Sequence, residues 1–339
     1  MKAEHSLAQL CAAFDVKRSG YQAWAKAGPS AQQRADAALL PKIRAAFARH
    51  KGRYGAPRIR EELAGAGARH SGKRIARLMQ GAGLRGLCSR RYVPRTTQSD
   101  HDQPIAPNLL AQRPAPTGPN QTWVTDLTYV RTAEGWLYVA VLLDLWSRRV
   151  VGWATAPTLH ACLATGALQM ALQHRRPPQG LLHHSDRGVQ YASGEYRELL
   201  KAGGLEPSMS RKGNPYDNAA MESFNATYKR ECVGLAEERG GYATRAEATA
   251  DFFDYVEKYY NRQRRHSALG YKSPVSKLFR NVPFLTHERM SPLLLGFLSP
   301  RLGVRDAGRP ERSVGRPESR APSRAAARTS SPRARIPFQ

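Results

Sequence analysis

The chain has 339 residues, enough for two modest domains, and its 53 Lys and Arg outnumber its 27 Asp and Glu to give a formal net charge of +26. So large a like-charge excess destabilises a compact protein unless a polyanion relieves it, which makes nucleic acid the first partner to expect. The segment from 281 onward holds eleven Arg against four acidic residues, so most of the excess belongs to residues 1–280. The longest apolar stretch, Trp136 to Leu145, is too short to cross a bilayer, so we expect no membrane partner.

The four cysteines, Cys11, Cys88, Cys162 and Cys232, are far apart in sequence and form no C-x-x-C pair. A structural zinc site of that kind is therefore not expected. The first residues also lack the long apolar core of a secretory signal. A reducing cytoplasm is the default setting.

Two helical regions are expected at the start of the chain. Residues 1–30 predict an N-terminal helical segment, because apolar residues recur there at helical spacing before a Gly-Pro pair ends the pattern. Residues 36–92 predict three short helices, the second starting near Pro57 and the third capped by Ser71. Basic residues lie on the outward positions of the last helix, namely Lys73, Arg74 and Arg77. Solvated helix faces are the alternative, but the charge of the chain favours a helix-turn-helix DNA-binding region.

The rest of the chain divides by composition. Residues 93–120 are a Pro-rich segment that predicts a linker, and residues 281–339, rich in Arg, Pro and Ser, predict a disordered tail. Residues 121–280 alternate between strand and helix patterns, which predicts a mixed α/β sheet. The predicted strands are Trp123–Val130, Trp136–Leu145, Arg149–Thr155, Leu181–His184 and Leu205–Met209. The predicted helices are His160–His174, one capped by Ser193, Asn218–Val233 and Arg245–Arg264.

Three acidic residues stand out inside the α/β region. Asp126 interrupts an apolar strand, Asp186 follows a strand end and Glu222 lies on a later helix. Taken singly, each has an ordinary explanation: an edge position or salt bridge, a turn residue, and solvated helix surface. Together they can converge over one edge of a sheet, where carboxylates repel each other unless a cation is present. Hard oxygen ligands suit Mg²⁺ or Mn²⁺, and two such ions about 3.5–4 Å apart would clamp the attacking and leaving oxygens of a phosphodiester.

These residues resemble the catalytic core of DDE transposases and retroviral integrases, which have an RNase H-like fold. Thirty-five residues separate Asp186 from Glu222, which is the spacing of that superfamily. The pattern is most similar to the second-frame (OrfB-type) transposases of bacterial insertion sequences, over roughly residues 5–280. The segments that carry the resemblance are Tyr54-Gly55 with Arg58-Ile59, His184-Ser185-Asp186-Arg187-Gly188, Asp217-Asn218-Ala219-x-x-Glu222-Ser223, and Tyr260-Asn261-x-x-Arg264-x-His266-x-x-Leu269-Gly270-Tyr271-x-Ser273-Pro274.

The resemblance and helix geometry assign residue roles. Asp126, Asp186 and Glu222 are the expected catalytic metal ligands. Lys229 resembles the basic residue that holds the DNA end, with a solvated surface position as the alternative. Asn218 and Asn225 share the helix face of Glu222 and are expected to orient the carboxylate or contact DNA. The remaining expected DNA contacts are His184, Arg187, Arg264 and His266.

The resemblance implies a DNA transposase that cleaves a strand at the end of an element and then joins the freed 3′-OH to another strand, through a circular intermediate. It implies an RNase H-like mixed-sheet core behind an all-α helix-turn-helix region, in a bacterial, nucleoid-associated protein. The chain begins where a second-frame product begins, so we expect a homo-oligomer on DNA and a first-frame product or fusion as a further partner. The alternatives are a nuclease on the same fold, which cuts without joining, and a non-catalytic DNA-binding regulator.

Overall fold

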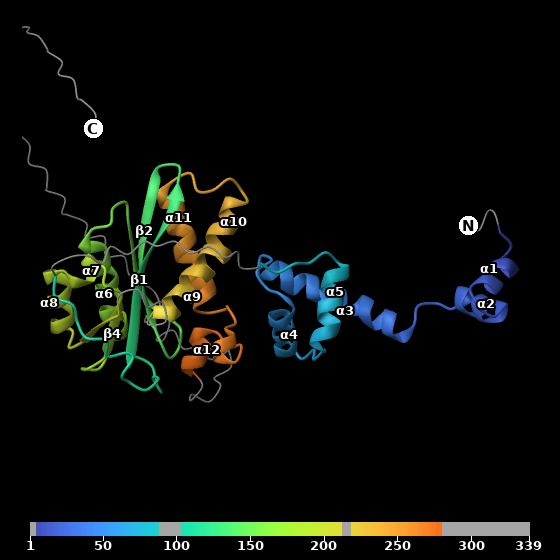
Figure 1. The fold of residues 1–339 in the computed structure, drawn as a ribbon, viewed down its shortest axis with the longest axis horizontal. Coiled ribbons are helices and arrows are strands. Elements are labelled where there is room, and N and C mark those ends of the chain that lie inside the picture. The colour runs from blue at the N-terminus through green and yellow to red at the C-terminus, as the bar shows by residue number, and fades with distance from the viewer. Residues whose placement is uncertain (1–4, 88–102, 212–217, 280–339) are drawn as a thin grey trace, which may run out of the picture. The chain divides into compact units, whose positions relative to one another are not determined.

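The computed structural model describes residues 5–87, 103–211 and 218–279 (Figure 1). The tail expected at 281–339 and the linker residues 93–102 lie outside the described residues. Residues 103–121 form an irregular segment with turns that leads into the first strand.

Two short helices come first, α1 (Leu7–Ala13) and α2 (Arg18–Lys26). A capping box begins α1, in which the Ser6 side chain accepts from the Gln9 N–H and the Gln9 side chain accepts from the Ser6 N–H. No residue of α2 is buried, so this helix packs weakly on the described part of the chain.

A three-helix module follows, formed by α3 (Ala31–Arg49), α4 (Ala56–Gly65) and α5 (Gly72–Gly81). Its helix starts have clear causes: Pro57 lies in the first turn of α4, and the Ser71 hydroxyl accepts from the Arg74 N–H at 3.2 Å. The α3 helix begins five residues earlier than residue 36, because Ser30 and Gln33 form a second capping box. The module is held together by apolar residues that are at most 5% exposed, namely Leu39, Ile43, Ile59, Leu63, Ile75 and Met79.

The rest of the described chain is built on a five-stranded sheet with the order β3-β2-β1-β4-β5. The first three strands are antiparallel neighbours, while β4 runs parallel to β1 and to β5. The strands are β1 (Thr122–Thr132), β2 (Gly135–Asp144), β3 (Val150–Ala156), β4 (Leu182–Ser185) and β5 (Glu206–Met209). All five predicted strands are present, and the mixed α/β prediction is confirmed.

Helices cover both faces of this sheet. Alternate residues of β2 belong to different cores: Val139 and Val141 pack towards one face, and Ala140 and Leu142 towards the other. Figure 1 shows α6–α8 on one side of the strands and α9–α11 on the other. The helices of the first group are α6 (Ala161–Arg175), α7 (Val189–Ala192) and α8 (Gly194–Ala202), and those of the second are α9 (Ala219–Tyr228), α10 (Gly234–Glu237) and α11 (Arg245–Phe253).

The two long helices predicted near the C-terminal end of the core are both interrupted. A π-helical turn at Lys229–Val233 joins α9 to α10, and another at Asp254–Tyr260 extends α11. Such turns insert an extra residue and redirect the side chains around them. A short 3₁₀ turn (Ser267–Leu269) and α12 (Pro274–Leu278) complete this region. Across the described helices, none combines the length and apolar character that a membrane crossing requires.

Candidate active site

Strand register brings Asp126 and Asp186 together. Strands β1 and β4 run in parallel with Val124 opposite His184, so continuing the register by two residues places Asp126 opposite Asp186. Neighbouring strands lie about 4.7–4.9 Å apart. Only Thr122–Val124 of β1 pair with β4, so β4 ends just before the two carboxylates and leaves that edge of β1 open. This is the strand-end position where ligands gather in α/β sheets.

Helix α9 carries the third acid, Glu222, and two asparagines at this helix bond to β1. The Asn225 side-chain amide donates to Oδ2 of Asp126 at 2.8 Å, and the Asn218 amide donates to the Thr125 carbonyl at 3.3 Å. Glu222 lies between these asparagines, three residues from Asn225 and therefore on the same helix face. Its side chain is exposed, so it can change rotamer without disturbing the core.

The three acids share one electrostatic environment. The pKa of Asp126 is raised to about 8, first by burial of the carboxyl, then by the nearby charge of Asp186 and, more weakly, by that of Glu222. Hydrogen bonds from the Leu127 N–H and from Asn225 oppose this rise. The pKa of Tyr191 is also raised, by burial and then by Asp186 and Asp126. The arrangement therefore concentrates negative charge that a cation can neutralise.

The donor set suits a hard divalent cation. Carboxylate oxygens are the ligands that Mg²⁺ and Mn²⁺ prefer, and mutual repulsion among ionised carboxylates is relieved by such an ion. Among the described residues, no three His, Cys, Asp or Glu side chains are already gathered closely enough to enclose a metal ion. Binding at this site would therefore bring the three acids closer together than they lie here.

The loop after β4 is shaped around Asp186. The Gly188 N–H donates to Oδ1 of Asp186 at 2.9 Å. A Cβ at Gly188 would lie 3.0 Å from that oxygen and 3.1 Å from Oε1 of Gln190. A larger residue here would have to displace the Asp186 carboxylate slightly, and the loop holds that carboxylate through its backbone.

Lys229 lies at the end of α9, where the sequence places it on the face of Glu222. Its Nζ is 4.6 Å from the centroid of the Tyr129 ring. Burial lowers the pKa of Lys229, and the charge of Asp126 acts in the opposite direction. The ammonium group is therefore within electrostatic reach of the acids. Sequence reasoning did not single out Tyr129, and its position offered no signal, because residues three apart on a strand point to opposite faces.

Three residues expected to contact DNA are buried in this structure. His184 is fully buried, and its two ring nitrogens lie 2.8 Å and 3.0 Å from the hydroxyls of Ser208 and Ser210. Arg264 is 4% exposed and paired with Glu231, and His266 is 8% exposed. Their side chains are closed off from a phosphate backbone by packing, which motif position alone could not reveal.

The other expected DNA contacts differ in availability. Arg187 is half-buried, and its Nε donates to the Ser210 carbonyl at 2.8 Å. On α5, Lys73 is exposed, whereas Arg74 and Arg77 form ion pairs with Asp36 at 2.6 Å and 2.5 Å. Those pairs lower the pKa of Asp36 and hold α5 against α3.

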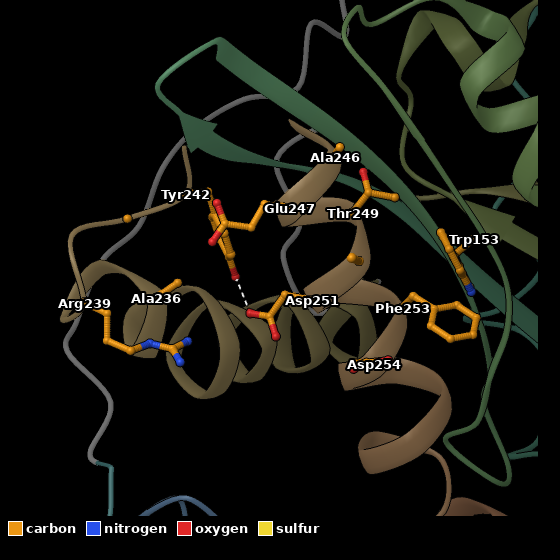
Figure 2. Close-up of a pocket in the computed structure, with 12 residues that line it drawn as sticks. Trp153, Ala236, Arg239, Tyr242, Ala246, Glu247, Thr249, Asp251, Phe253 and Asp254 are labelled. Atoms are coloured by element: carbon orange, nitrogen blue, oxygen red, sulfur yellow. Dashed lines mark hydrogen bonds between the residues drawn. The ribbon is translucent and has the colours of Figure 1, made fainter. Parts of the chain in front are cut away.

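A cavity of about 900 Å³ lies elsewhere, between Trp153 of β3 and the α10–α11 region. Figure 2 shows Tyr242 and Asp251 pointing towards each other inside it, joined by a 2.7 Å hydrogen bond. None of the three acids lines this cavity, nor does any other residue expected in the active site.

Comparison with known proteins identifies the class first. The chain matches the Integrase core domain family over residues 116–215 and again over 203–274, and an HTH-like domain family over 33–92. The matched domain is therefore that of a polynucleotidyl transferase of the integrase type. The HTLV-2 integrase catalytic core domain in complex with magnesium aligns with a TM-score of 0.38 at 16% identity, over 47% of this chain and 97% of that one.

Two proteins of similar sequence then identify the family. The chain is 46% identical over 267 residues to the 31 kDa protein of insertion element IS600 from Shigella sonnei, covering 79% of this chain and 96% of that protein. It is 42% identical over 279 residues to transposase InsF of insertion sequence IS3A from Escherichia coli K12, covering 80% and 94%. The chain belongs to this family of insertion-sequence transposases, as the sequence motifs predicted.

Proposed function

We propose that this chain catalyses metal-dependent DNA strand cleavage and strand transfer for an insertion sequence, with Asp126, Asp186 and Glu222 as the ligands of two divalent ions. The observation that carries the proposal is geometric: the parallel register places Asp126 opposite Asp186, and Asn225 on the helix of Glu222 donates to Asp126, so three mutually repelling carboxylates share one strand end. A protein keeps such repulsion where it has a use, and perturbed carboxylates in an open site are typical of catalytic centres.

Bound Mg²⁺ or Mn²⁺ would supply charge neutralisation and activation of the attacking oxygen at a phosphodiester. The residues of the chain do the positioning. Asn225 and the Leu127 N–H hold the two oxygens of Asp126, and the Gly188 N–H holds Oδ1 of Asp186, so both carboxylates are kept in place at the strand end. Lys229 is the proposed contact to the phosphate of the DNA end, next to Asp126.

The proposed reaction has two steps of the same kind. A water oxygen attacks the phosphodiester at the element end, and the 3′-oxygen leaves as a hydroxyl. That 3′-hydroxyl then attacks a phosphodiester of another strand, so one bond forms for each bond broken and no external energy source is consumed. The conversion needs precise placement of both strands rather than a covalent enzyme intermediate.

We further propose that the helical module α3–α5 binds the element end through its basic surface, on which Lys73 is exposed. Joining two ends calls for more than one active site, so a homo-oligomer on DNA is the proposed assembly. A first-frame product, separate or fused, is a proposed additional partner.

The test is a strand-transfer assay with labelled end DNA, Mg²⁺ or Mn²⁺, and the wild-type chain beside Asp126→Asn and the surface control Glu238→Gln. We expect joined products from wild type and Glu238→Gln, and none from Asp126→Asn. Cleavage without joining would favour the nuclease alternative. DNA binding with equal cleavage by wild type and Asp126→Asn would show that the assigned acids do not catalyse the reaction.

A further inference from the structure

A buried carboxylate in the catalytic core, Glu231, anchors a network of charged groups. Glu231 is fully buried, and its two carboxylate oxygens accept from Nε and Nη2 of Arg264 at 2.7 Å and 2.8 Å. The Tyr255 hydroxyl donates to the same carboxylate at 3.2 Å. Burial raises the pKa of Glu231, but hydrogen bonds and charge from Arg264 outweigh it and hold the pKa below its usual range. Glu231 is therefore ionised and matched with Arg264.

Two arginines of the helical module contact this network. Nε of Arg53 donates to the backbone carbonyl of Glu231 at 2.7 Å, and its guanidinium lies 4.3 Å from the centroid of the Tyr259 ring. Nη1 of Arg58, on α4, is 3.5 Å from Oε1 of Glu231. Arg53 is only 7% exposed, so this contact excludes water.

A second set of contacts lies beside the first. The Tyr54 hydroxyl accepts from the Arg265 N–H at 2.8 Å, and Oε2 of Glu62 accepts from Nε of Arg265 at 2.7 Å. Tyr54 is fully buried and stacks on His50 with ring centroids 3.8 Å apart. The Tyr54–Ile59 motif and the Tyr260–Pro274 motif thus contact one another, although about two hundred residues separate them in sequence.

Glu231 also belongs to the helical run that carries the candidate active-site residues. Glu222 is on α9, Lys229 begins the π-helical turn and Glu231 is two residues further on. Residues two apart on a helix point to nearly opposite sides. Lys229 accordingly lies over Tyr129 next to Asp126, while Glu231 contacts Arg264 and the module. One turn of helix thus connects the acid site to the DNA-binding module.

We propose that Glu231 is a positioning residue: it docks the helical module on the core and so fixes the distance between the DNA sequence bound by the module and the phosphodiester that is cut. This rests on the proposed function, since it concerns where that activity acts. Breaking a buried, hydrogen-bonded charge pair is costly, so the docked arrangement has few competing alternatives. A loose module would instead allow cuts at several neighbouring positions.

The experiment compares the full-length wild type with Glu231→Gln, Arg53→Met and the control Glu238→Gln, an exposed acid further along the same helical run. Hydrogen exchange of the α4 backbone amides reports docking, and exchange of β2 reports the fold of the core. Mapping of cut positions on a labelled element end in Mg²⁺ reports the functional consequence. Arg53→Met leaves the Glu231–Arg264 pair intact, so it tests docking even if Glu231→Gln destabilises the core.

We expect α4 exchange to rise by about tenfold or more in both interface variants, because charge-assisted hydrogen bonds commonly contribute at least that factor. The β2 amides should remain protected in Arg53→Met, and the single cut of the wild type should spread over adjacent phosphodiesters. Unchanged α4 exchange in both variants, or faster exchange with an unchanged cut position, would overturn the proposal. If wild type makes no cut, the proposed function fails, and the exchange data alone decide whether Glu231 docks the module.

Discussion

Replacing Asp126 with Asn should stabilise the metal-free protein at alkaline pH while removing its response to magnesium. In the folded chain the pKa of Asp126 is raised to about 8, against an ordinary value of 3.8. Between these two values the folded state holds a proton that the unfolded state has released. Stability therefore falls as pH rises from about 4 to about 8, and the full penalty is present above pH 8.

The size of the effect follows from that shift. A difference of about four pKa units corresponds to roughly 5 kcal/mol at 1.36 kcal/mol per unit. The carboxylate keeps some contact with water, so about 2–4 kcal/mol is the expected gain for Asp126→Asn above pH 8. For a domain of this size, that gain corresponds to a rise in Tm of roughly 4–16 °C.

The assay is thermal unfolding at pH 8.5, in EDTA and in MgCl₂, of wild type, Asp126→Asn and the control Glu238→Gln. In EDTA, Asp126→Asn should unfold at a higher temperature than the other two. Magnesium at ten times its Kd should stabilise wild type and the control by about 1.4 kcal/mol, and Asp126→Asn by much less. If Asp126→Asn is less stable than wild type in EDTA, and magnesium raises all three equally, the carboxylates do not repel one another as the structure indicates.

Three further predictions concern the surroundings of the site. Asn225→Ala should move the pH of half-maximal cleavage up by about one unit, because a hydrogen bond that favours ionised Asp126 is lost; a lower rate with an unchanged pH profile would contradict this. Lys229→Ala should weaken DNA binding uniformly across sequences and reduce the slope of log affinity against log salt concentration by about one. The exposed control Lys201→Ala should leave that slope unchanged. An unchanged slope in Lys229→Ala would show that Lys229 does not contact DNA. The pKa of Glu62 is lowered to about 2, first by the His50 ring, whose Nε2 lies 3.5 Å from Oε1 of Glu62, and then by the hydrogen bond from Arg265, so its contribution to stability is full above about pH 4.5 and is lost towards pH 2. Urea unfolding from pH 6 to pH 2.5 should therefore show a smaller loss for Glu62→Gln than for wild type, and equal losses would refute the pairing.

Periodicity and spacing were sufficient for most of the architecture. Short apolar segments, nearly continuous in Trp136–Leu145, located every strand of the sheet, and the cap at Ser71 and the proline at 57 located two helices of the module. The early start of α3 was also readable, because Ser30 and Gln33 are a capping-box pair. The π-helical turns after Tyr228 and after Phe253 could not be predicted from the sequence, because no local sequence signal marks them.

The candidate site divides in the same way. The approach of Asp126 to Asp186 follows from the parallel register of two predicted strands, and the face of Glu222 follows from helix spacing. The burial of His184, Arg264 and His266 could not be read from the chain, because each depends on partners far away in sequence. Glu231 carried a weak signal as an acid followed directly by Cys232 and Val233. An acid next to apolar residues can be buried with a cationic partner, but only the folded structure shows that this partner is Arg264.

The most direct measurement is a titration of Mn²⁺ binding in the presence of element-end DNA, detected by electron paramagnetic resonance. It compares the wild-type chain with Asp126→Asn, Asp186→Asn and Glu222→Gln. If these side chains form one centre, each substitution should abolish the same binding event, and Glu238→Gln should bind as wild type does. Undiminished Mn²⁺ binding by all three variants, each shown to be folded, would contradict the assignment of a shared metal centre to these acids.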